Sequence, residues 1–428
     1  MNRITWMFSI LAIGLGGAGW ALEAESPPRQ WRTLAGETRD AAAMEAFVSR
    51  LMDQYRVTAL SVAVVDGGQT VFERTLGVVD PKTGKPADER TVFRAASLTK
   101  PLFAYLILKL VDEGVLDLNT PIVRYLPKPL YAHPAYASLK DDPRYERLTA
   151  RLLLSHQSGL PNWRRVRPNG PIQFVANPGD QFGYSGEGYA LLQFVIETVT
   201  GQDLPTLARE KVFVPLKMND TSFLWEPRFD GHFGVELDSP LGQFIEKTRH
   251  TGNAAASVIT HASDYARFLA AVLNGDGLKP QTRAAMLEPQ VALTSKSLFS
   301  APGTDPGTNR AHKMAWALGW GTFQDTHGRA LFHVGAEEGC ENCVEAFPDR
   351  GLGIAVLSLT TSNDSFMAPL VDYAIGAAFS PLEWLEYGQP DFLDWLGHWW
   401  LWILAGVVMV GLAILLWGLR STVRRAWR

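Results

Sequence analysis

Apolar residues recur along the chain with two different periods, which separate predicted helices from predicted strands. Spacings of three and four predict helices over 41–55, 101–113, 187–200, 204–214, 263–274 and 371–379. Shorter apolar runs predict two hairpins, one from strands 60–66 and 69–76 and one from strands 343–347 and 352–359. The predicted strands therefore come from both ends of the chain.

This order of elements predicts an α+β fold. Strands from both ends would form one antiparallel sheet flanked by helices, because consecutive hairpins pair with each other and bury an apolar face under helices. Between the hairpins, roughly over 97–290, the pattern predicts a mainly helical insert.

Two segments without charged residues lie near the ends of the chain. The first follows Arg3, ends before Glu23 and predicts a secretory signal over 1–24, with an uncleaved anchor as the alternative. The second, 399–419, has 21 residues, enough at about 1.5 Å per residue to cross a bilayer core of about 30 Å.

The charges around 399–419 predict an orientation in the membrane. Acidic residues precede the segment in the connector 381–398, and arginines follow it in the tail 420–428. Because basic residues stay on the cytoplasmic side, we expect a cytoplasmic C-terminus and an extracytoplasmic, periplasmic domain over 30–380.

Composition narrows the choice of partners. The chain has 428 residues, of which 46% are hydrophobic and 20% charged, and a formal net charge of −4. This balance is typical of a globular protein and gives no basic surface for nucleic acid. We expect a small-molecule or peptide substrate and a membrane attachment, and leave the oligomeric state open.

The segment Ser97-Leu98-Thr99-Lys100 carries the most specific chemistry. It stands at the start of the predicted helix that Pro101 opens and Gly114 ends, so Ser97 and Lys100, three residues apart, would be neighbours on one helical turn. A desolvated lysine amine can take the proton of a serine hydroxyl, which makes Ser97 a candidate nucleophile. The alternative is a capping serine beside a surface lysine.

Two later segments complete the candidate chemistry. Tyr184 stands directly before the helix predicted to begin at 187, where a phenol beside Lys100 could transfer protons; the alternative is a half-buried core tyrosine. His333 stands near the end of a predicted strand, and Gly335 would let a substrate approach the backbone. A lone histidine is more often structural.

In this order the three segments resemble the motifs of the serine β-lactamase and penicillin-binding protein family. The resemblance is to its class C branch with related esterases and DD- and D-amino peptidases, whose motifs are Ser-x-x-Lys, then Tyr-x-Asn or a variant, then Lys-Thr-Gly or His-x-Gly. Flanking residues 93–96, 152–161, 214–221 and 318–321 agree, and the resemblance covers roughly 40–380. It implies a β-lactamase/DD-peptidase-like fold.

The resemblance also implies a role for each residue. Ser97 would be the acylated nucleophile, Lys100 its activating amine and Tyr184 the proton carrier, while His333 would replace the lysine of the third motif. The backbone N–H groups of Ser97 and Ala336 would form an oxyanion hole.

Further implied positions lie around these groups. Gly186, Gly335, Glu337 and Trp320 would contact the substrate, and His156 would hold a loop rather than act as a base. The implied reaction is two-step acyl transfer to water, without a metal or an organic cofactor.

The chain departs from the family pattern at several positions. Gly186 stands where lactamases have an asparagine, and Val334 stands where they have a threonine or serine that helps to bind a carboxylate. Glu337 and Glu338 follow. Because like charges repel in a poorly solvated cleft, we expect neutral or amine-bearing esters or amides to be preferred over β-lactams. The alternative is that both glutamates face solvent.

The expected function is therefore a membrane-anchored extracytoplasmic serine hydrolase that cleaves an ester or amide through an acyl-enzyme on Ser97. A D-Ala-D-Ala carboxypeptidase or β-lactamase acting at the cell wall is one alternative. A non-catalytic binding or regulatory module on the same fold is another.

Cys340 and Cys343 are the only cysteines. Export would favour a disulfide between them, but residues three apart in a regular strand point to opposite faces, so a bridge requires a turn at 341–342. A disulfide and a free pair both remain open. A zinc or redox role is less favoured, since two ligands do not complete a zinc site.

Overall fold

The computed structural model describes residues 30–163, 171–235, 246–295, 297–298, 307–337, 339–360 and 365–383. The predicted signal segment, the predicted membrane segment 399–419, most of the connector before it and Glu338 lie outside these residues. Among the helices that can be described, none combines the length and apolar character that a bilayer crossing requires.

A nine-stranded antiparallel sheet is built from both ends of the chain, as predicted. Its order is β5-β4-β3-β13-β12-β11-β10-β9-β8. The N-terminal strands are β3 (Val57–Asp66), β4 (Gln69–Asp80) and β5 (Lys85–Pro86). The C-terminal strands are β8 (Val291–Ala292), β9 (Ala315–Trp316), β10 (Gly321–Asp325), β11 (Gly328–Glu337), β12 (Cys340–Phe347) and β13 (Leu352–Thr360). The pairing of β3 with β13 joins the two groups.

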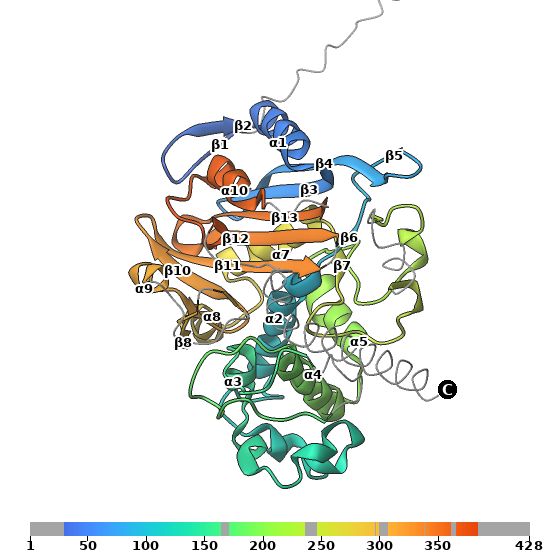
Figure 1. Cartoon of the computed structure of the whole chain (residues 1–428), viewed down its shortest axis with the longest axis vertical. Coiled ribbons are helices and arrows are strands. Elements are labelled where there is room, and N and C mark those ends of the chain that lie inside the picture. The colour runs from blue at the N-terminus through green and yellow to red at the C-terminus, as the bar shows by residue number, and fades with distance from the viewer. Residues whose placement is uncertain are drawn as a thin grey trace, which may run out of the picture.

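Helices cover both faces of the sheet (Figure 1). On one face lie α1 (Ala41–Tyr55) and α10 (Met367–Ile375), and on the other lies α7 (Ala262–Asn274). Each layer contributes to a separate apolar cluster, because buried side chains alternate along the strands between the two faces. The central strands β3, β11, β12 and β13 are therefore mostly buried on both sides, whereas β4 and β5 at one edge are mostly exposed or half-buried.

A mainly helical lobe lies beside the sheet, in the lower part of Figure 1. It contains α2 (Thr99–Asp112), α3 (Ala150–Leu154), α4 (Gly186–Thr200) and α5 (Leu204–Ala208), with α5 followed by a π-helical turn over Arg209–Phe213. Two further helices are α8 (Pro280–Leu287) and α9 (Thr308–Ala311). Two-stranded pairs are β1 (Gln30–Arg32) with β2 (Thr38–Asp40), and β6 (Phe93–Arg94) with β7 (Ile259–Thr260).

Most predicted helices and both hairpins are present, with shifted ends. The last helix ends at Ile375 rather than at 379, because Gly376 adopts a left-handed conformation (φ 67°) and its N–H bonds to the carbonyl of Asp372. The helix predicted over 204–214 changes to a π-helical turn at Arg209. Propensity and periodicity do not distinguish such a turn from an α-helix.

Close backbone packing joins the sheet to the lobe at Gly335 in β11. A Cβ atom at this position would lie 2.3 Å from the carbonyl oxygen of Ala95 and 3.2 Å from the backbone nitrogen of Ser97. Glycine is required here because a neighbouring segment of the chain approaches its backbone, whereas the sequence predicts the approach of a substrate. This contact places the turn that carries Ser97 against the strand that carries His333.

We predict that Gly335→Ala lowers the free energy of unfolding by about 1–3 kcal/mol, because the added methyl group has no space. Gly183→Ala is the matched control, since no atom lies within 4 Å of a Cβ there and the backbone conformation is ordinary. Chemical denaturation of both variants measures the difference. Equal stabilities would show that the turn and the strand are not tightly packed.

Candidate active site

Ser97 lies in a short 3-10 turn, η1 (Ala96–Leu98), directly before α2. Ala96 has a positive φ of 46°, which is unfavourable for a residue with a side chain and indicates a constrained turn. The next residues are anchored from outside: Thr99 Oγ1 accepts from the N–H of Val258 at 3.0 Å, and the Tyr265 hydroxyl donates to the carbonyl of Leu98 at 2.9 Å. Ser97 is thereby held at the N-terminal end of α2.

Lys100 is completely buried beside Ser97. Its Nζ lies 3.0 Å from Ser97 Oγ and donates a hydrogen bond to the carbonyl of Ala255 at 2.8 Å. Burial lowers the pKa of Lys100 to about 7, and the negative charge of Glu337 partly opposes this shift. A large fraction of the amine is therefore neutral near pH 7 and can accept the proton of Ser97.

Tyr184 completes the arrangement from the loop before α4. Its hydroxyl is hydrogen-bonded to Ser97, and Lys100 Nζ lies 4.7 Å from the centre of its ring. Burial raises the pKa of Tyr184 above its ordinary value, with the hydrogen bond to Ser97 acting in the opposite direction. The phenol is therefore protonated and can donate. The structure thus brings together Ser97, Lys100 and Tyr184.

His333 lies next to this group, on β11, and is completely buried. Its ring centre is 6.4 Å from that of Tyr184. Nδ1 lies 2.7 Å from the carbonyl of Val334, and because a carbonyl only accepts, Nδ1 carries the proton and Nε2 does not. Burial and the charge of Lys100 lower the pKa of His333 to about 3, so the ring is neutral at physiological pH. His333 supplies no positive charge.

Neighbouring positions on β11 differ in their surroundings. Val334 packs into the cluster under α1 and α10, whereas Ala336 is exposed. The backbone at Gly335 lies against the backbone nitrogen of Ser97. The N–H groups of Ser97 and Ala336 therefore belong to adjoining segments.

Glu337 is partnered by a cation. Its Oε2 lies 2.9 Å from Nη1 of Arg94, and the backbone of Arg94 is held by a 2.9 Å hydrogen bond from Asn342 Nδ2 to the Arg94 carbonyl. The positive charge of Arg94 therefore offsets the negative charge of the Glu337 carboxylate. This finding removes Glu337 as a reason to expect strong repulsion of anions.

Two predicted substrate contacts have packed surroundings. A Cβ on Gly186 would lie 2.8 Å from the carbonyl oxygen of Asn162 and 2.9 Å from the indole of Trp163, so no side chain fits there without movement. Trp320 is fully buried, with its ring 6.0 Å from that of Phe268. The burial of Trp320 places it in the core rather than at a substrate surface, which corrects its predicted role.

Both cysteines are free and buried. They lie in the regular strand β12, where the spacing of three places their side chains on opposite faces, so the disulfide is not formed. Cys343 Sγ instead lies 3.3 Å from Met367 Sδ. Across the residues that can be described, no three His, Cys, Asp or Glu side chains gather as metal ligands.

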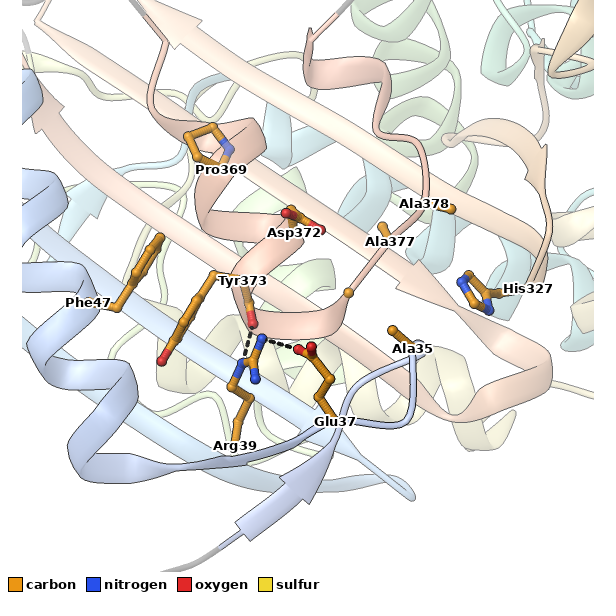
Figure 2. Close-up of a pocket in the computed structure, with 11 residues that line it drawn as sticks. Ala35, Glu37, Arg39, Phe47, His327, Pro369, Asp372, Tyr373, Ala377 and Ala378 are labelled. Carbon is orange, nitrogen blue, oxygen red and sulfur yellow. Dashed lines mark hydrogen bonds and ion pairs between the residues drawn. The ribbon is translucent and has the colours of Figure 1, made fainter.

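A cavity of about 570 Å³ lies away from Ser97, between the β1–β2 segment and α10 (Figure 2). Figure 2 shows Arg39 pointing to Glu37 and to the backbone of Tyr373. Arg39 forms an ion pair with Glu37 and donates a 3.0 Å hydrogen bond to the carbonyl of Tyr373. The ring of Tyr373 stacks on that of Phe47 at 3.8 Å. These contacts attach the N-terminal strands to α10.

Sequence reasoning did not identify two contributors to the site. One is the carbonyl of Ala255, which is a backbone group and so cannot be predicted from the residue type. Arg94 lies three positions before Ser97, but its partner Glu337 is 243 residues away, and only the fold brings them together.

Comparison with known proteins identifies relatives in sequence and in fold. The Beta-lactamase family model matches residues 44–378. Esterase EstB of Burkholderia gladioli is 26% identical, with 77% of this chain and 93% of that protein covered.

Two solved structures share the fold. One is an octameric penicillin-binding protein homologue from Pyrococcus abyssi (TM-score 0.61, 20% identity, 81% of this chain and 79% of that one). The other is a class C beta-lactamase (TM-score 0.61, 15% identity, 79% and 96%). The chain belongs to the Beta-lactamase family, and it is a serine hydrolase.

We predict that kcat/KM rises with pH through a midpoint near 7, because only the neutral amine of Lys100 accepts a proton. Glu337→Gln moves this midpoint to lower pH, since the carboxylate that favours the charged amine is lost. Hydrolysis rates between pH 5 and 9 measure both effects.

Glu226→Gln is the matched control, because Glu226 pairs with Arg228 at 3.1 Å and does not contribute to the pKa shift of Lys100. It should leave the midpoint unchanged. A midpoint that stays in place in Glu337→Gln would contradict the electrostatic link between Glu337 and Lys100.

Proposed function

We propose that the protein is a membrane-anchored, extracytoplasmic serine hydrolase that cleaves neutral esters or amides through an acyl-enzyme on Ser97. The observation that carries the proposal is the 3.0 Å contact between Ser97 Oγ and the buried amine of Lys100, whose pKa is lowered to about 7. A serine hydroxyl beside a neutral amine is an activated nucleophile.

The proposed reaction has two proton-balanced steps. In acylation, Ser97 gives its proton to Lys100 and attacks the carbonyl carbon, while the Tyr184 hydroxyl protonates the leaving group and regains a proton from Lys100. In deacylation, water gives a proton to the pair of Lys100 and Tyr184 and attacks the acyl carbon. Ser97 Oγ then leaves and takes a proton back from this pair. The contacts of Lys100 with Ser97 and with the Tyr184 ring support this route.

The backbone N–H groups of Ser97 and Ala336 are the proposed oxyanion hole. The packing of Gly335 against the Ser97 turn supports this assignment, since it places the exposed end of β11 beside the nucleophile. Such donors stabilise the negative charge that develops on the carbonyl oxygen during attack.

The surroundings of the nucleophile favour neutral substrates. His333 is neutral, Val334 has no hydroxyl, and Arg94 and Glu337 offset each other. Gly186 has no amide side chain to hold an acyl amide, and Trp163 leaves no space for one. The similarity to an esterase supports the same choice. Activity as a D-Ala-D-Ala carboxypeptidase or a β-lactamase is the second candidate, supported by the structural neighbours.

We predict that the purified protein hydrolyses p-nitrophenyl butyrate with a kcat/KM at least about tenfold above that for a chromogenic cephalosporin. Ser97→Ala abolishes both activities and the covalent labelling by a serine-reactive phosphonate. Faster cleavage of the cephalosporin would overturn the substrate assignment. Labelling of the wild type without turnover of any acyl ester would instead favour a binding module.

The proposed membrane attachment rests on the uncharged segment 399–419 and its arginine-rich flank. We predict that the full chain stays with membranes after carbonate washing, and that a chain ending at 398 is released with its esterase activity retained. Full release of the uncut chain would contradict the anchor.

A further inference from the structure

His156 holds the residues on both sides of Tyr184. Its backbone carbonyl accepts a hydrogen bond from the N–H of Gly183 at 2.8 Å, and its side-chain Nδ1 accepts one from the N–H of Ser185 at 3.0 Å. The backbone of Tyr184 is thus attached before and after the phenol to a single residue.

The imidazole ring also contacts the phenol. The two ring centres lie 4.2 Å apart with an angle of 33° between the planes. Tyr189 and Trp316 lie against the same imidazole, at 5.1 Å and 5.2 Å. His156 therefore fixes both the backbone and one side of the ring of Tyr184.

The chemistry of the contact selects one form of the imidazole. Because Nδ1 accepts from Ser185, it carries no proton, and the proton of the neutral ring is on Nε2. Burial and the nearby charge of Lys100 hold the pKa of His156 well below its usual value. The ring remains neutral and its acceptor remains available.

His156 has a backbone conformation that is unfavourable for a residue with a side chain. Its φ is +56°, a left-handed conformation that a side chain destabilises. Its buried Nε2 has no hydrogen-bond partner within the residues that can be described. Strain and an unsatisfied donor are typical of residues whose geometry serves a site.

We propose that His156 is a positioning residue for the hydrolysis, acting through Tyr184 to hold the phenol against Ser97 and Lys100. This inference rests on the proposed role of Tyr184. His156 does not exchange protons with the substrate; it limits the positions that the phenol can adopt. A small displacement of a catalytic group can cost about 100-fold in rate.

Two substitutions separate the side-chain contact from the backbone conformation. His156→Gly suits the left-handed conformation and keeps the carbonyl bond to Gly183, but loses the acceptor and the ring. His156→Asn also tolerates this conformation and can place an oxygen near the position of Nδ1. We expect kcat for ester hydrolysis to fall about 100-fold in H156G and less than tenfold in H156N, with KM within about threefold in both.

A double-mutant cycle with Tyr184→Phe tests whether His156 acts through the phenol. Once the hydroxyl is removed, H156G should reduce kcat by less than about threefold further. A purely structural residue would reduce the rate of the Tyr184→Phe enzyme as much as that of the wild type. Circular dichroism and thermal melting check folding, and Lys217→Gly, a left-handed exposed position, is the control with unchanged activity.

The outcomes distinguish this inference from the proposed function. Full activity of Tyr184→Phe would overturn the role of Tyr184 and with it the proposed mechanism. A large loss in Tyr184→Phe together with a normal H156G, or with independent effects in the cycle, would overturn only the role of His156. If H156G does not fold, H156A serves in the same cycle with the same criteria.

Discussion

The burial of the Lys100 amine between Ser97 and the carbonyl of Ala255 is the interaction on which the site depends. In water a lysine amine is protonated and cannot act as a base at neutral pH. Complete burial removes the hydration that favours the charged form, and two hydrogen-bond partners, Ser97 Oγ and the carbonyl of Ala255, do not replace it. The fold thereby produces a base of suitable strength three residues from the hydroxyl that needs it.

The rest of the architecture keeps this amine buried and its partners in place. The sheet closes one side through the contact of Gly335 with the Ser97 turn, and Tyr184 closes another through the loop before α4. His333 lies in the same buried surroundings, and burial lowers its pKa as well, with the charge of Lys100 acting in the same direction. Glu337, which is paired with Arg94, partly opposes the lowering of the Lys100 pKa by burial.

The sequence was informative where local spacing determines the outcome. The spacing of three between Ser97 and Lys100 predicts that these two are neighbours, and the two hairpins predict the sheet from both ends of the chain. The position of Tyr184 beside this pair was an expectation from the family resemblance and not from spacing. The sequence was less informative where distant segments meet. The neutralisation of Glu337 by Arg94, the packing of Trp163 against Gly186 and the burial of Trp320 all depend on tertiary contacts that no periodicity encodes.

The ionisation of Lys100 itself is the most direct test of this account. Full-length protein in detergent, labelled with ¹³C at lysine side chains, gives a titration curve for each amine by NMR, and Lys100→Arg identifies the signal of Lys100. The account predicts a midpoint near pH 7. A midpoint close to the ordinary lysine value of about 10.4 would show that the amine remains charged, and would contradict its role as the base.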